Sequence, residues 1–243
     1  MAHLGVLHDL EERDLTPSEI VGTSMGGIIG ACLAIGMKEE EIYGQVKKFS
    51  KVRTWIKFSW GGNALVENDK LEKIFHSIFG ELKISETLIP LKLIATNLLT
   101  GEKKVFDAED DVSIVDALLC TIAIPGIFEE HLVDDSIYVD GFLCENLGLN
   151  ETSLDHLIAV DVLGQHSFGD TMPSNRLKTR NMMEMFEKSM RLLIYNQTQS
   201  SLRHTNKSVL LIEPDTKTFS THQFHKVDEI RQTGIGLFYH RTK

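Results

Sequence analysis

Residues 20–30 read Ile20-Val21-Gly22-Thr23-Ser24-Met25-Gly26-Gly27-Ile28-Ile29-Gly30. They place one serine between glycines, where a short apolar strand turns into an apolar helix. This pattern is typical of a nucleophile elbow, a tight turn that projects a serine hydroxyl from the end of a strand. Gly22 and Gly26 stand two residues on either side of Ser24, where we expect a side chain to collide with neighbouring backbone. A G-x-S-x-G string also arises by chance, so the alternative is a glycine-rich turn without catalysis.

A serine hydroxyl is a weak nucleophile until a base accepts its proton. One carboxylate is well placed for this role. Asp140 ends the β-rich run 137–139 and is followed by Gly141, and sites in open α/β sheets form where strands end. A single Asp-Gly pair is also common in surface turns, so this assignment depends on the motifs around it.

Histidine is the other base to consider. Six histidines follow Asp140, as the Ser-Asp-His order of α/β-hydrolases requires: His156, His166, His204, His222, His225 and His240. None of them has a distinctive local setting. A conventional Ser-His-Asp esterase therefore stays open as one interpretation.

Several segments, in order, resemble motifs of the patatin-like phospholipase family. They are residues 2–7, 21–27, 95–102, 123–128 and 138–141. The resemblance covers roughly residues 1–165 and is weaker beyond. It implies a Ser-Asp dyad without a histidine, in which Ser24 attacks an ester carbonyl and Asp140 takes the proton. The Met25 amide would be an oxyanion donor, and the reaction would cleave lipid or phospholipid acyl esters through an acyl-enzyme.

The chain departs from the family's pattern in two places. The family's first strand and glycine-rich oxyanion loop do not occur within residues 1–243, and loss of one oxyanion donor can cost ~10²–10³ in rate. Either the chain's start was assigned too late, or it is an inactive lipid-binding or interaction protein. We favour the enzyme because Ser24 and Asp140 both persist. After Asp140, the chain has Phe142, Glu145 and Gly148 where the family usually has other residues. We expect these differences to affect the orientation of the Asp140 side chain and the room for substrate.

Composition restricts the class of protein. The chain has 243 residues, a net charge of −10 and 42% hydrophobic residues. The acidic balance argues against a nucleic-acid partner, because phosphate neutralisation needs a basic surface. No apolar run reaches the ~18 residues of a membrane span, and the three cysteines are scattered, which is typical of a reducing compartment. We expect a cytoplasmic protein that needs no metal or organic cofactor.

One segment, residues 47–60, is basic and aromatic, and it contains Trp55, Phe58 and Trp60. Such residues suit the headgroup region of an anionic membrane, and this would give peripheral membrane contact. The alternative is a cap packed over the site. Residues 181–201 carry a methionine-rich apolar stripe that could contact acyl chains or a partner. The alternative is that the stripe belongs to the hydrophobic core or forms a homodimer face.

The periodicity of the chain predicts alternating helices and strands. Helices are expected at 2–13, 25–36, 39–50, 68–79, 111–121, 181–203 and 222–234, and strands at 19–22, 91–97, 103–106, 137–140, 156–161 and 208–213. This alternation predicts an α/β fold with a mostly parallel sheet flanked by helices on both faces. We expect a single domain over 1–243, with the motifs in 1–165 and a weaker-matching tail over 166–243.

Overall fold

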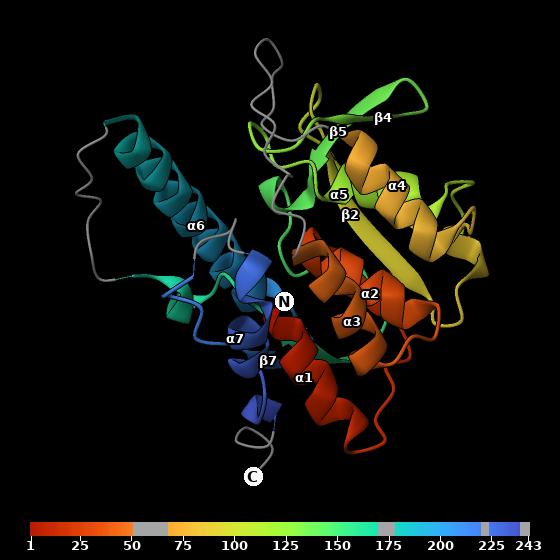
Figure 1. Cartoon of the computed structure of the whole chain (residues 1–243), viewed down its shortest axis with the longest axis horizontal. Coiled ribbons are helices and arrows are strands. Elements are labelled where there is room, and N and C mark those ends of the chain that lie inside the picture. The colour runs from red at the N-terminus through yellow and green to blue at the C-terminus, as the bar shows by residue number, and fades with distance from the viewer. Residues whose placement is uncertain (51–67, 170–177, 220–223, 239–243) are drawn as a thin grey trace.

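The computed structural model describes residues 1–50, 68–169, 178–219 and 224–238 (Figure 1). The helices are α1 (Ala2–Glu11), α2 (Met25–Ala34), α3 (Glu39–Ser50), α4 (Asn68–Phe79), α5 (Ile114–Thr121), α6 (Lys178–His204) and α7 (Val227–Gln232). The strands are β1 (Ile20–Thr23), β2 (Leu91–Asn97), β3 (Lys103–Phe106), β4 (His131–Val133), β5 (Ser136–Asp140), β6 (His156–Val160) and β7 (Ser208–Ile212). A central sheet with packed helices confirms the α/β class.

The sheet is less parallel than the sequence pattern predicts. In the central sheet β1 pairs with β2 in parallel, whereas β3 and β5 pair with β2, and β4 with β5, in antiparallel fashion. Strands β6 and β7 form a separate parallel pair. One of these antiparallel pairs, β4 with β5, follows from its short connection. Asp134 and Asp135, both at positive φ, turn β4 directly into β5, and such tight hairpins join only antiparallel strands.

Strand β2 brings the ends of β1 and β5 together. Thr23 at the end of β1 lies opposite Ile94, and Asp140 at the end of β5 lies opposite Ala95. Strand β3 occupies the other edge of β2 over the same residues, so β1 and β5 share one edge and approach from opposite directions. The residue after Thr23 is Ser24, which places the predicted nucleophile and base at one point of the sheet.

The largest core cluster packs helices α2 and α5 against β2, with Leu93, Ala31 and Leu118 among its fully buried members. A smaller cluster joins α1 to the C-terminal part of the chain through Val6, Leu10, Ile212 and Phe238. The buried Asp9 carboxylate also accepts hydrogen bonds from the Gly236 and Phe238 amides. The tail beyond residue 166 therefore packs on the first helix, while the single-domain assignment stays a prediction.

Helix α6 projects from the body of the molecule in Figure 1. Its apolar side chains include exposed residues: Met182, Met185, Phe186, Leu192 and Leu193. The stripe is thus not core over these residues, contrary to one of the two interpretations of the sequence. Among the described residues, no helix combines the length and the apolar character that crossing a membrane requires.

Candidate active site

The nucleophile elbow forms at the junction of β1 and α2. Ser24 is the residue before α2 and has φ 54° and ψ −129°, a conformation that L-residues adopt rarely and that costs of order 1–3 kcal/mol. Its side chain makes no capping hydrogen bond to the helix. The hydroxyl is therefore available to other groups at the strand end.

The expected backbone collision is confirmed at one of the two elbow glycines, Gly22, and not at the other, Gly26. A Cβ on Gly22 would lie 2.6 Å from the Gly27 Cα, so the approach of β1 to α2 requires glycine there. A Cβ on Gly26 would meet no backbone. Its nearest neighbour would be the His3 Nε2, at 3.4 Å, so the expectation of a backbone collision at Gly26 is wrong. The strand and helix cross at Gly22 and Gly27, which leaves Gly26 on the side of α1.

Asp140 is fixed on both sides of its backbone. Its amide donates to the Ala123 carbonyl at 3.0 Å, and its carbonyl accepts from the Thr96 hydroxyl at 3.1 Å. Its carboxyl Oδ1 accepts a 3.1 Å hydrogen bond from the Phe142 amide. The side chain is fully buried, and within the described residues Oδ2 accepts no hydrogen bond of ordinary geometry.

Burial raises the pKa of Asp140 to about 7, and the Ser24 hydroxyl and the Phe142 amide oppose that rise by stabilising the charged form. The cause is desolvation, which disfavours a carboxylate away from water. An ordinary aspartate ionises near 3.9. The Asp140 carboxyl is therefore partly ionised near neutral pH. The strand register, with Thr23 opposite Ile94 and Asp140 opposite Ala95, is what brings Ser24 and Asp140 to neighbouring positions.

Thr121 holds the elbow from behind. Its hydroxyl accepts a 2.9 Å hydrogen bond from the Ser24 amide and donates to the Ile94 carbonyl on β2. The side chain is fully buried at the end of α5. No sequence motif predicted a role for Thr121. The available signal was a single hydroxyl inside the apolar run 117–124.

The Met25 amide stands at the start of α2, as predicted. The first α2 amides that donate to the Ser24 carbonyl are those of Gly27, at 2.9 Å, and Ile28, at 3.2 Å. The amides that precede them have no acceptor inside the helix. They carry the positive end of the helix dipole, which favours an anion beside Ser24.

The residues after Asp140 that differ from the family's usual pattern lie in a loop held by its own hydrogen bonds. The Glu145 Oε1 accepts from the amides of Leu147, at 3.3 Å, and Gly148, at 3.2 Å. Gly148 has φ +62°, and a Cβ there would lie 2.5 Å from Val21 Cγ1. The Thr23 hydroxyl donates to the Glu145 carbonyl at 3.3 Å. The loop is thus bonded to the elbow, while its effect on the orientation of Asp140 stays a prediction.

The described histidines after Asp140 lie elsewhere. His204 contacts Ser200 on its own helix, and His156, His166 and His225 are exposed. His222 and His240 lie outside the described residues. Among the described histidines, His3 lies against the elbow, because its Nε2 is the nearest neighbour of a Cβ built on Gly26, and no sequence pattern indicated it. Burial lowers the pKa of His3 to about 3, so its ring is neutral. Trp55, Phe58 and Trp60, predicted to contact a membrane or form a cap, lie outside the described residues.

A sequence model of the patatin-like phospholipase family matches residues 1–152. The chain therefore belongs to the patatin-like phospholipase family, and the resemblance of its motifs is confirmed.

Known relatives differ from this chain in length. An uncharacterized NTE family protein of Mycobacterium tuberculosis is 28% identical over 172 residues, which are 68% of this chain and 46% of that protein. Lysophospholipase NTE1 of Scheffersomyces stipitis is 24% identical over 97% of this chain and 16% of its own length. The chain thus spans less than half of these relatives.

A solved structure has the same fold. VipD from Legionella pneumophila superposes with a TM-score of 0.55 at 15% identity, over 99% of this chain and 64% of that chain.

Proposed function

We propose that this protein is a serine acyl hydrolase that cleaves lipid acyl esters with Ser24 and Asp140 as its catalytic dyad. The observation that carries the proposal is the meeting of β1 and β5 on one edge of β2, which brings the Ser24 hydroxyl to the buried Asp140 carboxyl. A carboxyl with a pKa near 7 is a stronger base than an ordinary aspartate and is still partly ionised at neutral pH.

The reaction would proceed in two halves. The Ser24 Oγ attacks the ester carbonyl carbon while Asp140 accepts its proton, and the Met25 amide donates to the resulting oxyanion. The carbon–oxygen bond to the alcohol breaks, and Asp140 returns the proton to the departing oxygen. Water then gives a proton to Asp140 and attacks the carbonyl carbon of the acyl-Ser24 ester. The bond between that carbon and Ser24 Oγ breaks, the fatty acid leaves, and Asp140 returns the proton to Ser24 Oγ.

The name of the fungal relatives suggests a substrate to test first. Those proteins are called lysophospholipases, and we propose a lysophospholipid, which has one acyl chain, as the substrate class. Peripheral membrane contact, a cytoplasmic location and a homodimer stay proposals of the same kind.

The direct test measures fatty acid released from lysophosphatidylcholine by the purified chain at pH 8. We expect turnover that falls at least ~10³-fold in Ser24→Ala and in Asp140→Asn. His3→Gln and the exposed control His204→Gln should retain turnover within a few-fold. Loss of activity in a folded histidine variant would favour a Ser-His-Asp esterase instead.

A second function has a specific observation in its favour. Among the described residues, the Met25 amide is the one predicted oxyanion donor. An oxyanion hole with a single donor would favour an inactive lipid-binding protein. This protein would bind lysophosphatidylcholine, as measured by calorimetry, yet release no fatty acid. Ser24→Ala would then leave the affinity for lysophosphatidylcholine unchanged, and neither the wild type nor the variant would release fatty acid.

A further inference from the structure

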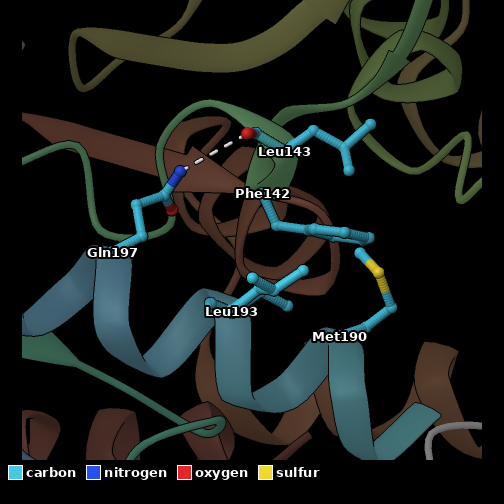
Figure 2. Close-up of a pocket in the computed structure, with 6 residues that line it drawn as sticks. Phe142, Leu143, Met190, Leu193 and Gln197 are labelled. Atoms are coloured by element: carbon cyan, nitrogen blue, oxygen red, sulfur yellow. Dashed lines mark hydrogen bonds between the residues drawn. The ribbon is translucent and has the colours of Figure 1, made fainter. Parts of the chain in front are cut away.

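A pocket of about 250 Å³ lies between α6 and the turn η2 (Gly141–Leu143), which follows Asp140 directly. Figure 2 shows the side chains that line it. They are Phe142, Leu143, Met190, Leu193, Ile194 and Gln197. We call it the η2–α6 pocket.

The lining of the η2–α6 pocket is mostly apolar and carries no charged side chain. The Gln197 amide Nε2 donates to the Leu143 carbonyl at 3.4 Å, which joins the two walls (Figure 2). The Met190 side chain reaches toward the Phe142 ring in the same view. This lining suits a hydrocarbon chain, and it offers no counter-charge to a phosphate or an ammonium group.

The lining of the pocket starts at Phe142, two residues after Asp140. The amide of Phe142 is the donor to Asp140 Oδ1, and a Cβ on Gly141 would lie 3.0 Å from the Thr23 Cγ2, one residue before Ser24. The loop that follows is bonded to α6, since the Asn146 Nδ2 donates to the Thr198 hydroxyl at 2.9 Å. Helix α6 is therefore held against the segment that carries the base.

The apolar stripe of α6 continues the pocket outward. Met182, Phe186, Met190 and Leu193 follow one another at intervals of three or four residues, so they share one side of the helix. Met182 is 70% exposed, Phe186 54% and Leu193 62%. A continuous row of exposed apolar side chains is unusual on a soluble monomer and often marks a binding surface.

We propose that the η2–α6 pocket binds the acyl chain of the ester attacked by Ser24 and that Phe142 closes its inner end. The row of Met182 and Phe186, which continues from Met190 and Leu193 on one side of α6, contacts the outer part of a long chain. This inference rests on the proposed function. The pocket is smaller than the ~300–1,000 Å³ of typical small-molecule sites, which fits part of one hydrocarbon chain and not two. Phe142 then determines the preferred chain length.

The first test compares two neighbouring leucines on α6. Leu192 and Leu193 are both exposed, but only Leu193 is among the residues that line the pocket. Glutamine is a good helix former, so Leu193→Gln and Leu192→Gln form a matched pair. With p-nitrophenyl esters of two to sixteen carbons, we expect Leu193→Gln to lose roughly tenfold in kcat/KM on long chains relative to acetate. Leu192→Gln should keep the wild-type profile.

The second variant opens the inner end of the pocket. Phe142→Ala retains the amide that donates to Asp140 and removes the ring. We expect the optimum to move to longer chains, with roughly a fourfold gain in kcat/KM for each further methylene that becomes buried. Reduced activity on every ester with an unchanged optimum would overturn the role of Phe142.

The outcomes separate the two proposals. Hydrolysis of no ester by the wild-type chain would defeat the proposed function itself. Hydrolysis with a chain-length profile that is the same in wild type, Leu193→Gln and Phe142→Ala would overturn the acyl pocket alone. A wild-type dimer that Leu193→Gln converts to monomer, with an unchanged profile, would overturn it in favour of a face between two copies of this chain.

Discussion

The Ser24 amide donates a 2.9 Å hydrogen bond to the hydroxyl of Thr121, 97 positions further along the chain. The same hydroxyl donates to the Ile94 carbonyl on β2. Ser24 has positive φ and lies next to the buried Asp140 carboxyl. One hydroxyl thus ties the strained elbow to the central strand, and this tie fixes the direction in which the Ser24 side chain points.

Loss of the Thr121 hydroxyl should therefore affect chemistry more than binding. Thr121→Val keeps the shape of the side chain but removes the acceptor of the Ser24 amide and one donor to the Ile94 carbonyl, at a cost of about 1–3 kcal/mol in unfolding free energy. We expect kcat to fall by roughly tenfold or more, with KM nearly unchanged. Thr121→Ser restores the hydroxyl and should restore kcat. Equal kcat in the valine and serine variants would show that the hydrogen bond has no positioning role.

The pH dependence of turnover should report Asp140. Only the ionised carboxylate accepts the Ser24 proton, and burial raises its pKa to about 7. We expect kcat/KM to fall below about pH 7 and to reach a plateau above about pH 8, when a stable ester is assayed between pH 5 and 9. A fall centred near pH 4, where an ordinary aspartate titrates, would mean that Asp140 is not the base or is not desolvated.

The same raised pKa should appear in stability. The folded chain holds the Asp140 proton up to about pH 7, whereas the unfolded chain releases it near the ordinary value, so stability falls as pH rises between these two points. The shift from 3.8 to about 7 is roughly three units, and at about 1.4 kcal/mol each this gives an upper bound of roughly 4 kcal/mol. Asp140→Asn removes the ionisation.

We therefore expect the Asp140→Asn variant to be at least as stable as the wild type at pH 8 and to lose that advantage at pH 5. Urea unfolding of both chains at the two pH values measures the difference. A wild type that gains stability relative to the variant as pH rises would contradict the desolvation of Asp140.

The two elbow glycines should respond differently to alanine. Gly22→Ala places a Cβ 2.6 Å from the Gly27 Cα, where backbone and not a flexible side chain must move. We expect a loss of about 3 kcal/mol or more, or a failure to fold. Gly26→Ala places its Cβ at ordinary contact distance from His3, and alanine is the better helix former. Its melting temperature should stay within a few degrees of wild type, as thermal unfolding by circular dichroism would show.

Much of this site could be predicted from the sequence because its signals are local. The glycines around Ser24 and the Asp-Gly turn after β5 predict the elbow and the base within a few residues of chain. The helix and strand boundaries also follow from periodicity, with α1, α3 and β2 placed close to their predicted ends. Short-range patterns encode these features directly.

The rest depends on contacts between distant segments. Nothing near Asp140 in the sequence reveals that its carboxyl is fully buried, and this burial raises its pKa. Thr121 meets Ser24 only because α5 packs on β2. Strand β4 was not predicted, since the Asp134-Asp135 turn lacks glycine and proline. Strands β3 and β5 were predicted, but their antiparallel pairing with β2 depends on contacts that the local sequence does not show. The position of α6 over Phe142 also requires the folded chain.

The measurement that most directly tests the proposed dyad is labelling with an alkyl fluorophosphonate at pH 8, followed by mass spectrometry of the peptides. We expect a single adduct on Ser24, no adduct in Ser24→Ala, and labelling slowed at least ~10²-fold in Asp140→Asn. A folded chain that takes up no fluorophosphonate, or takes it up on another residue, would contradict the assignment of Ser24 as the nucleophile activated by Asp140.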